Sequence, residues 1–87
     1  MKNDVIKMLI EIKDKRTHCQ CSRAKVVERI AFEEIISNLD AVSEWNKEDV
    51  VRMLKENAEK ERNPSDSQIF KTAYNYAIKI VETYDRK

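Results

Sequence analysis

Apolar residues are most concentrated between residues 26 and 39, in the segment VVERIAFEEIISNL. At 100° per residue, the apolar positions of this segment spread over about 280° of a helical wheel. A surface helix needs an apolar stripe of only about 100°, so this helix is predicted to be surrounded by neighbouring helices or by another chain. Glu28, Arg29, Glu33 and Glu34 lie in the same run, and their charged groups must contact water or partners.

Three further segments have apolar residues at helical spacing. Residues 4–16 form an apolar arc of about 200°, and residues 47–62 and 66–85 form arcs of about 160° each. The chain has no glycine and one proline, so turns that need a positive φ are disfavoured, and with them a β-rich fold. We therefore predict an all-α fold, a compact bundle of four helices in one domain over residues 1–87, with the helix over 23–38 wrapped by the others.

Capping residues mark the predicted helix ends. Ser22 is expected to be the N-cap of the helix over 23–38, and Asn46 that of the third helix. Pro64 disfavours helical geometry at the preceding residue, so it is expected to end the third helix. Ser65, with Gln68 three residues later, has the spacing of a capping box for the last helix.

The positive and negative charges of the chain nearly cancel, so the protein as a whole has no strong electrostatic field. Charged residues make up 38% of the chain, yet the net charge is only +1, so nothing global favours nucleic acid or an anionic membrane. No apolar run approaches the roughly 18 residues of a membrane-spanning helix, and the N-terminal residues MKNDVIKM do not resemble a signal peptide. We expect no membrane association.

The two cysteines, Cys19 and Cys21, are separated by one residue, which is too short a segment for comfortable disulfide geometry. Free thiols indicate a reducing compartment, so we expect a cytoplasmic protein. Together with His18 they form a cluster of soft ligands, but zinc usually takes four ligands from two separated pairs, and no second pair exists. We predict an ordinary polar loop, without metal or cofactor.

A basic loop over residues 13–25 could contact phosphate. Asp14 is its only acidic residue, and phosphate binding by lysine and arginine does not depend on sequence. Nucleic-acid binding is therefore one alternative function, and a nucleotide held between subunits by this loop and the tyrosines is another. The residues concerned are Lys13, Lys15, Arg16, His18, Arg23 and Lys25.

Two acidic pairs suggest a third alternative. Glu56-x-x-Glu59 and Glu82-x-x-Asp85 resemble the paired acidic motifs of all-α nucleoside triphosphate pyrophosphatases of the MazG type. That resemblance implies Mg²⁺ held between helices and hydrolysis of a nucleotide. In a hairpin of the last two helices, however, the pairs would lie about 20 Å apart at 1.5 Å per residue, so only an antiparallel dimer could bring them together.

The remaining candidates are interface residues. Glu34 falls between apolar positions on the wheel, where a carboxylate is expected to pair with a basic side chain or to make a buried polar contact to a ligand or another subunit. The last helix carries most of the aromatic residues on its apolar stripe. We predict the following interface residues: Glu28, Phe32, Glu34, Tyr74 and Tyr76.

The summed apolar arcs exceed what an 87-residue monomer readily hides, so we expect a homo-oligomer, most simply a dimer. The function that fits best is a small non-enzymatic helical protein-interaction module. An adaptor or inhibitor, of the kind found among phage and mobile-element accessory proteins, is the expectation for a chain of this size.

Overall fold

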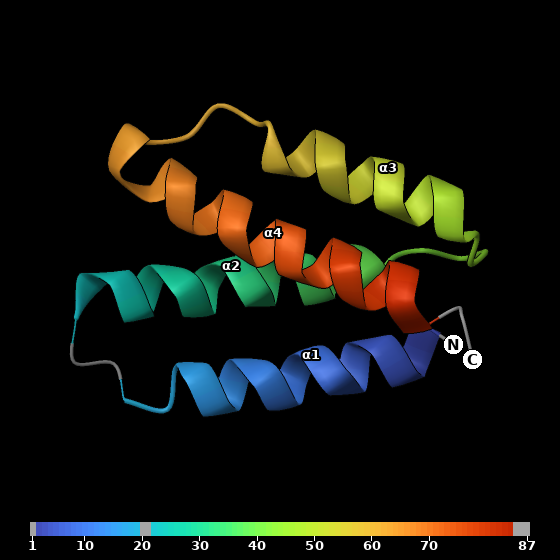
Figure 1. Ribbon diagram of the computed structural model, residues 1–87, viewed down its shortest axis with the longest axis horizontal. Coiled ribbons are helices and arrows are strands. Elements are labelled where there is room, and N and C mark those ends of the chain that lie inside the picture. The colour runs from blue at the N-terminus through green and yellow to red at the C-terminus, as the bar shows by residue number, and fades with distance from the viewer. Residues whose placement is uncertain (1, 20–21, 85–87) are drawn as a thin grey trace.

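The computed structural model describes residues 2–19 and 22–84, and these form four α-helices with no strand among them. The helices are α1 (Lys2–Arg16), α2 (Arg23–Asp40), α3 (Lys47–Ala58) and α4 (Pro64–Tyr84). The predicted all-α, four-helix fold is confirmed. Figure 1 shows α1 and α2 as one antiparallel pair and α3 and α4 as another, with α1 beginning and α4 ending at the same end of the molecule. No helix within the described ranges is long and apolar enough to cross a membrane.

The last helix, α4, joins the two pairs. It packs most extensively against α2 and α3, whereas α1 packs mainly against α2 and only lightly against α4. The helix α3 takes α4 as its main neighbour, so the most extensive contacts of α2 are with α4 and α1. Most of the wide apolar arc of α2 is covered by α1 and α4, whereas Val26 and Ile30 of the same arc stay exposed. The largest fully buried side chains come from all four helices and include Leu9, Phe32, Leu54 and Tyr74.

Two of the predicted N-caps are confirmed. The hydroxyl of Ser22 accepts a hydrogen bond from the backbone N–H of Lys25 at 3.3 Å, and Oδ1 of Asn46 accepts one from Asp49 at 3.2 Å. In both cases the side chain satisfies one of the backbone N–H groups that the first helical turn leaves without a carbonyl partner.

The third helix ends earlier than predicted, at Ala58 rather than near residue 62. The Nδ2 group of Asn57 donates to the backbone carbonyl of Met53 at 2.9 Å, and the guanidinium of Arg62 donates to the carbonyl of Asn57 at 2.9 Å. Arg62 thus folds back onto the end of the helix and binds a carbonyl of its last turn, while the chain leaves the helix at Glu59. Local periodicity did not reveal this long side chain acting as a cap.

The last helix begins at Pro64, two residues before the predicted start, and the capping-box assignment was wrong. Oδ1 of Asn63 accepts from the backbone N–H of Ser65 at 3.1 Å and from its hydroxyl at 2.9 Å. Asn63 is therefore the capping side chain. Pro64 occupies the first helical position, where its missing N–H costs no hydrogen bond and its fixed φ suits the helix.

Candidate functional site: a groove between α1 and α4

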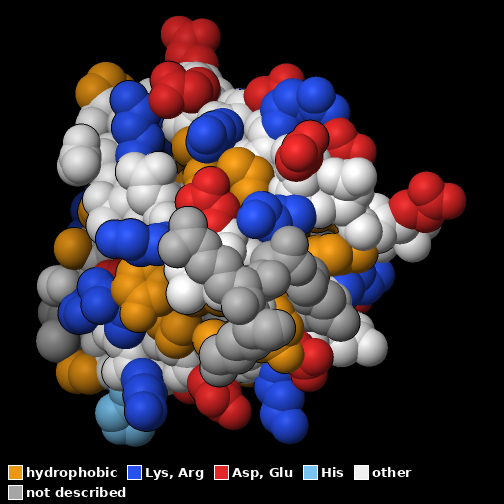
Figure 2. Space-filling view, turned by 45° about the vertical axis from the view of Figure 1, so that its right-hand side comes forward, with side chains coloured by type: hydrophobic (Ala, Val, Ile, Leu, Met, Phe, Trp, Pro, Cys, Tyr) orange, Lys and Arg blue, Asp and Glu red, His pale blue; other side chains and the backbone are white. Residues whose placement is uncertain are grey.

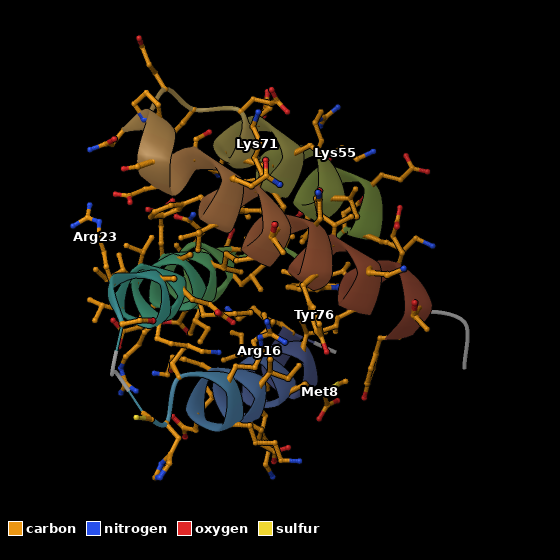
Figure 3. The ribbon with its side chains drawn as sticks, turned by 60° about the vertical axis from the view of Figure 1, so that its left-hand side comes forward. Met8, Arg16, Arg23, Lys55, Lys71 and Tyr76 are labelled. Atoms are coloured by element: carbon orange, nitrogen blue, oxygen red, sulfur yellow. The ribbon has the colours of Figure 1, made fainter. Side chains whose placement is uncertain are left out.

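A groove lies between α1 and α4 because both helices pack on α2 while touching each other only lightly. It contains two adjoining hollows of about 160 and 380 Å³, and Tyr76 lines both of them. Figure 3 shows Met8, Arg16 and Tyr76 in the space between the two helices. Tyr76, Ile80 and Thr83 follow the i, i+4, i+7 spacing of one helical face, so a single face of α4 forms one wall.

The smaller hollow is floored by α2. The ring of Phe32, which is only 1% exposed, meets the ring of Tyr76 edge to face, with centroids 6.4 Å apart and planes at 76°. Nε of Arg16 donates to Oε1 of Glu28, which joins the end of α1 to α2. The complete lining is Arg16, Glu28, Phe32, Gln68, Ile69, Thr72, Ala73 and Tyr76.

The larger hollow is mainly apolar and more open. Met8 is 37% exposed and Tyr76 is 43% exposed, and they are two of the large hydrophobic side chains that the fold leaves most accessible. Ile80 and Tyr84 complete the apolar lining, with Lys79 and Thr83 at the rim. The Tyr84 hydroxyl donates to Asp4, and this bond raises the pKa of that phenol above its usual value.

A second polar cluster lies on the other side of α2, where it faces α4 and the α3–α4 connection. The guanidinium of Arg62 donates to Oε1 of Glu34 at 2.8 Å, and the Tyr74 hydroxyl donates to the same oxygen. The side-chain amide of Asn38 donates to the Tyr74 hydroxyl at 3.3 Å. We call Glu34, Asn38, Arg62 and Tyr74 the Arg62 cluster.

Aromatic rings enclose the cation of this cluster. The guanidinium carbon of Arg62 lies 4.2 Å from the ring centroid of Phe70 and 5.6 Å from that of Tyr74, and the Arg62 side chain is 11% exposed. Its Nε is buried without a hydrogen-bond partner within the described ranges, and the stacked rings supply cation–π attraction. Burial raises the pKa of the Tyr74 phenol well above its usual range, and the hydrogen bond to Glu34 raises it further. The cluster thus connects α2, the α3–α4 connection and α4.

The structure divides the five predicted interface residues into two groups. Glu28, Phe32 and Tyr76 come together in the groove, whereas Glu34 and Tyr74 meet in the Arg62 cluster. The pairing expected for Glu34 is present, with a basic residue from the α3–α4 connection as its partner.

Met8 is a groove residue that the sequence interpretation did not single out. It belonged to the wide apolar arc of residues 4–16, and a helical wheel cannot tell which apolar position on such an arc stays exposed.

Acidic side chains neutralise most of the basic loop. Lys13 lies 3.6 Å from Glu33, Arg16 pairs with Glu28, Arg23 places Nη2 3.2 Å from both oxygens of Asp66, and Lys25 lies 3.9 Å from Glu28. Among the six predicted phosphate contacts, only Lys15 and His18 have no ion pair within the described part of the chain, and both are exposed. These ion pairs are unlike a continuous phosphate-binding surface. The face seen in Figure 2, at the end of the molecule where the chain begins and ends, also carries both acidic and basic side chains, with hydrophobic atoms between them.

The acidic pairs and the cysteines do not assemble into a site within the described residues. Glu56 and Glu59 are exposed near the end of α3, whereas Glu82 borders a shallow hollow with Lys47 and Glu48 at the start of that helix. Asp85 and Cys21 lie outside the described residues, and no group of three or more histidine, cysteine or acidic side chains suited to a metal ion occurs in residues 2–19 and 22–84.

Comparison of the chain with protein-family models, with curated proteins and with solved structures finds no match. The groove and the Arg62 cluster are therefore interpreted from their own geometry and chemistry.

Proposed function

We propose that this chain is a small, non-enzymatic protein-interaction module that binds another protein in the groove between α1 and α4. The observation that carries the proposal is the larger hollow, where Met8 and Tyr76 keep more than a third of their surface exposed beside Ile80 and Tyr84. Scattered single apolar residues are normal on a protein surface, but apolar residues that converge on one concavity are typical of a binding site.

The Arg62 cluster supports this assignment by fixing the α4 wall of the groove. Tyr74 is fully buried and hydrogen-bonds to Glu34 of α2, while Tyr76, two residues later, points to the opposite side of the helix. The groove wall is thereby held against α2 by a partly buried polar contact. A preformed concave surface loses less conformational entropy on binding than one that must first become ordered.

A homodimer, which the sequence predicts, is a separate proposal, and the exposed residues outside the groove support it. Val26 is 38% exposed and Ile30 is 49% exposed, and their i, i+4 spacing places them on one face of α2. Such a face could pair with its copy about a two-fold axis. Light scattering at micromolar concentration should then give a mass above 10.3 kDa, and Ile30→Glu should reduce it to that value. A wild-type mass of 10.3 kDa would remove the dimer but leave the groove proposal intact. We propose that the chain acts in the reducing environment of the cytoplasm, whether or not it forms a dimer.

The groove proposal is tested with two matched variants of α1. Met8 and Ile10 are 37% and 40% exposed, and two residues along a helix point in nearly opposite directions. Random peptides displayed on phage are selected on the wild-type chain, and each binder is measured against Met8→Glu and Ile10→Glu. We expect binding to fall at least about tenfold with Met8→Glu and to change less than about twofold with Ile10→Glu. Binders affected equally by both variants, or by neither, would refute the groove as the binding site.

A further inference from the structure

The shape and the charges of the groove define the partner that would fill it. We infer that the groove binds one amphipathic helix of a different protein, with an apolar stripe facing the groove and acidic residues along the edges of that stripe. This inference rests on the proposed function and specifies the chemistry of the partner.

The dimensions of the groove favour a helix. Its lining on α4 extends from Gln68 to Tyr84, which corresponds to about 24 Å at 1.5 Å per residue, the length of a four-turn helix. The two hollows follow each other along this length and meet at Tyr76. Apolar side chains one or two turns apart on a partner helix would enter them in succession, as in other helix-in-groove complexes.

Symmetry disfavours a second copy of the chain as the occupant. A two-fold interface places the same surface of both copies face to face. Two concave grooves that meet in this way leave each other unfilled. Val26 and Ile30 lie two positions before Glu28 and Phe32, which border the groove, so they point to nearly the opposite side of α2. The face that carries Val26 and Ile30 would therefore meet a neighbour's groove in a head-to-tail contact, and such contacts close into rings only for particular rotations and otherwise extend into filaments. A helix from another protein fills the groove and requires neither an empty groove nor a head-to-tail assembly.

The charges around the groove favour acidic residues on the partner. Lys79 borders the larger hollow and makes no ion pair with any described residue. In the smaller hollow, Glu28 is the only acidic lining residue, and it faces both Arg16 and Lys25. Asp4 accepts a hydrogen bond from Tyr84 and keeps its charge, but it does not line either hollow. Among the lining residues, two cations, Arg16 and Lys79, stand against one carboxylate, that of Glu28. Interfaces are generally complementary in charge, so this balance favours acidic residues on the partner.

Two synthetic helical peptides test the inference. Both have 18 residues, a side-chain crosslink on the outer face to hold the helix, and the same leucine and isoleucine stripe, but one has glutamates and the other lysines beside the stripe. Fluorescence anisotropy gives the Kd of each for the wild-type chain, for Met8→Glu and for Ile10→Glu. We expect the acidic peptide to bind at least about fivefold more tightly than the basic one, with the preference decreasing as salt is raised.

Charge reversal at one position locates the effect. Lys79→Glu should weaken binding of the acidic peptide by about three- to tenfold and strengthen binding of the basic one. Lys55→Glu changes the net charge equally but lies on α3, away from the groove, as Figure 3 shows, and should change either Kd by less than about twofold. Lys79 and Lys55 are both exposed, so neither change is expected to prevent folding, even if Met8→Glu did.

The outcomes separate the inference from the proposed function. Tighter binding of the acidic peptide that depends on both Met8 and Lys79 supports both. Equal or tighter binding of the basic peptide, still lost in Met8→Glu, overturns the acidic-helix inference and leaves the groove function standing. Failure of both peptides to bind overturns the inference, whereas the displayed-peptide selection tests the groove independently. A wild-type dimer that Met8→Glu dissociates but Ile10→Glu does not would identify a second copy as the occupant and overturn the inference.

Discussion

Replacing Arg62 by methionine tests whether the Arg62 cluster stabilises the fold. The substitution keeps an unbranched apolar side chain between Phe70 and the α2 face but removes the guanidinium. It breaks the hydrogen bonds to Glu34 and to the carbonyl of Asn57 and removes the cation–π contact with Phe70. Arg52→Met is the matched control, because Arg52 also pairs with a carboxylate, that of Asp49, but on the surface.

The magnitude follows from burial. A hydrogen bond to a charged group contributes about 1.5–3 kcal/mol, and a cation–π contact contributes about 0.5–2 kcal/mol. The Glu34 side chain is 37% exposed, so water screens part of the ion pair, and we expect a net loss of about 2–3 kcal/mol in the free energy of unfolding. For Arg52, whose side chain is 71% exposed and whose partner is 63% exposed, we expect a change within about 0.5 kcal/mol.

Urea denaturation followed by circular dichroism at 222 nm measures both variants. With a slope near 1 kcal/mol per molar urea for a chain of this size, Arg62→Met should lower the midpoint by about 2–3 M and Arg52→Met by less than about 0.5 M. Glu34→Gln in the Arg62→Met background should recover part of the loss, because no uncompensated carboxylate then remains, and a double-mutant cycle should give a coupling near 1 kcal/mol. Equal midpoints for Arg62→Met and Arg52→Met would refute the stabilising role of the cluster.

Two further predictions concern stability. Because burial and the bond to Glu34 raise the pKa of folded Tyr74, the folded state retains this proton at a pH where the unfolded chain, with a pKa of about 10, loses it. The stabilisation is thus fully present below pH ~10 and is lost above it at about 1.4 kcal/mol per pH unit. The free energy of unfolding should therefore fall less steeply between about pH 10 and 11.5 in Tyr74→Phe than in the wild-type chain. An unchanged slope would contradict the role assigned to Tyr74. Asn63→Ala should lower the free energy of unfolding by about 1 kcal/mol, because Asn63 caps α4. Ser65→Ala should lower it by less than half as much. The reverse order would support the capping box predicted for Ser65.

Features encoded by neighbouring residues could be predicted well. The wheels of the four apolar segments indicated four helices, and the caps at Ser22 and Asn46 were correct because a cap depends on a side chain and a backbone N–H three residues apart. The end of α3 was placed too late because its cap, the Arg62 side chain, belongs to the next connection and also requires Glu34 of α2. That geometry exists only once α2 and the α3–α4 connection have come together.

The candidate site was predicted only in part. Glu34 stood out because a carboxylate on an apolar arc needs a partner, but its partners lie 28 and 40 residues away, beyond any local pattern. Glu28 and Phe32 of α2 and Tyr76 of α4 were recognised as candidates, without any indication that they would border one groove. The basic loop had the composition of a phosphate-binding segment, yet acids from α2 and α4 neutralise most of it.

By itself, then, the sequence determined the helices, their apolar faces and the charged residues that needed partners, because these depend on spacing within one segment. The tertiary structure decided which faces meet. It placed α4 between α2 and α3, left α1 only lightly in contact with α4, and so brought Met8 and Tyr76 into the same groove. Periodicity fixes which residues share a face, whereas the packing of one face on another depends on contacts between residues far apart in the chain.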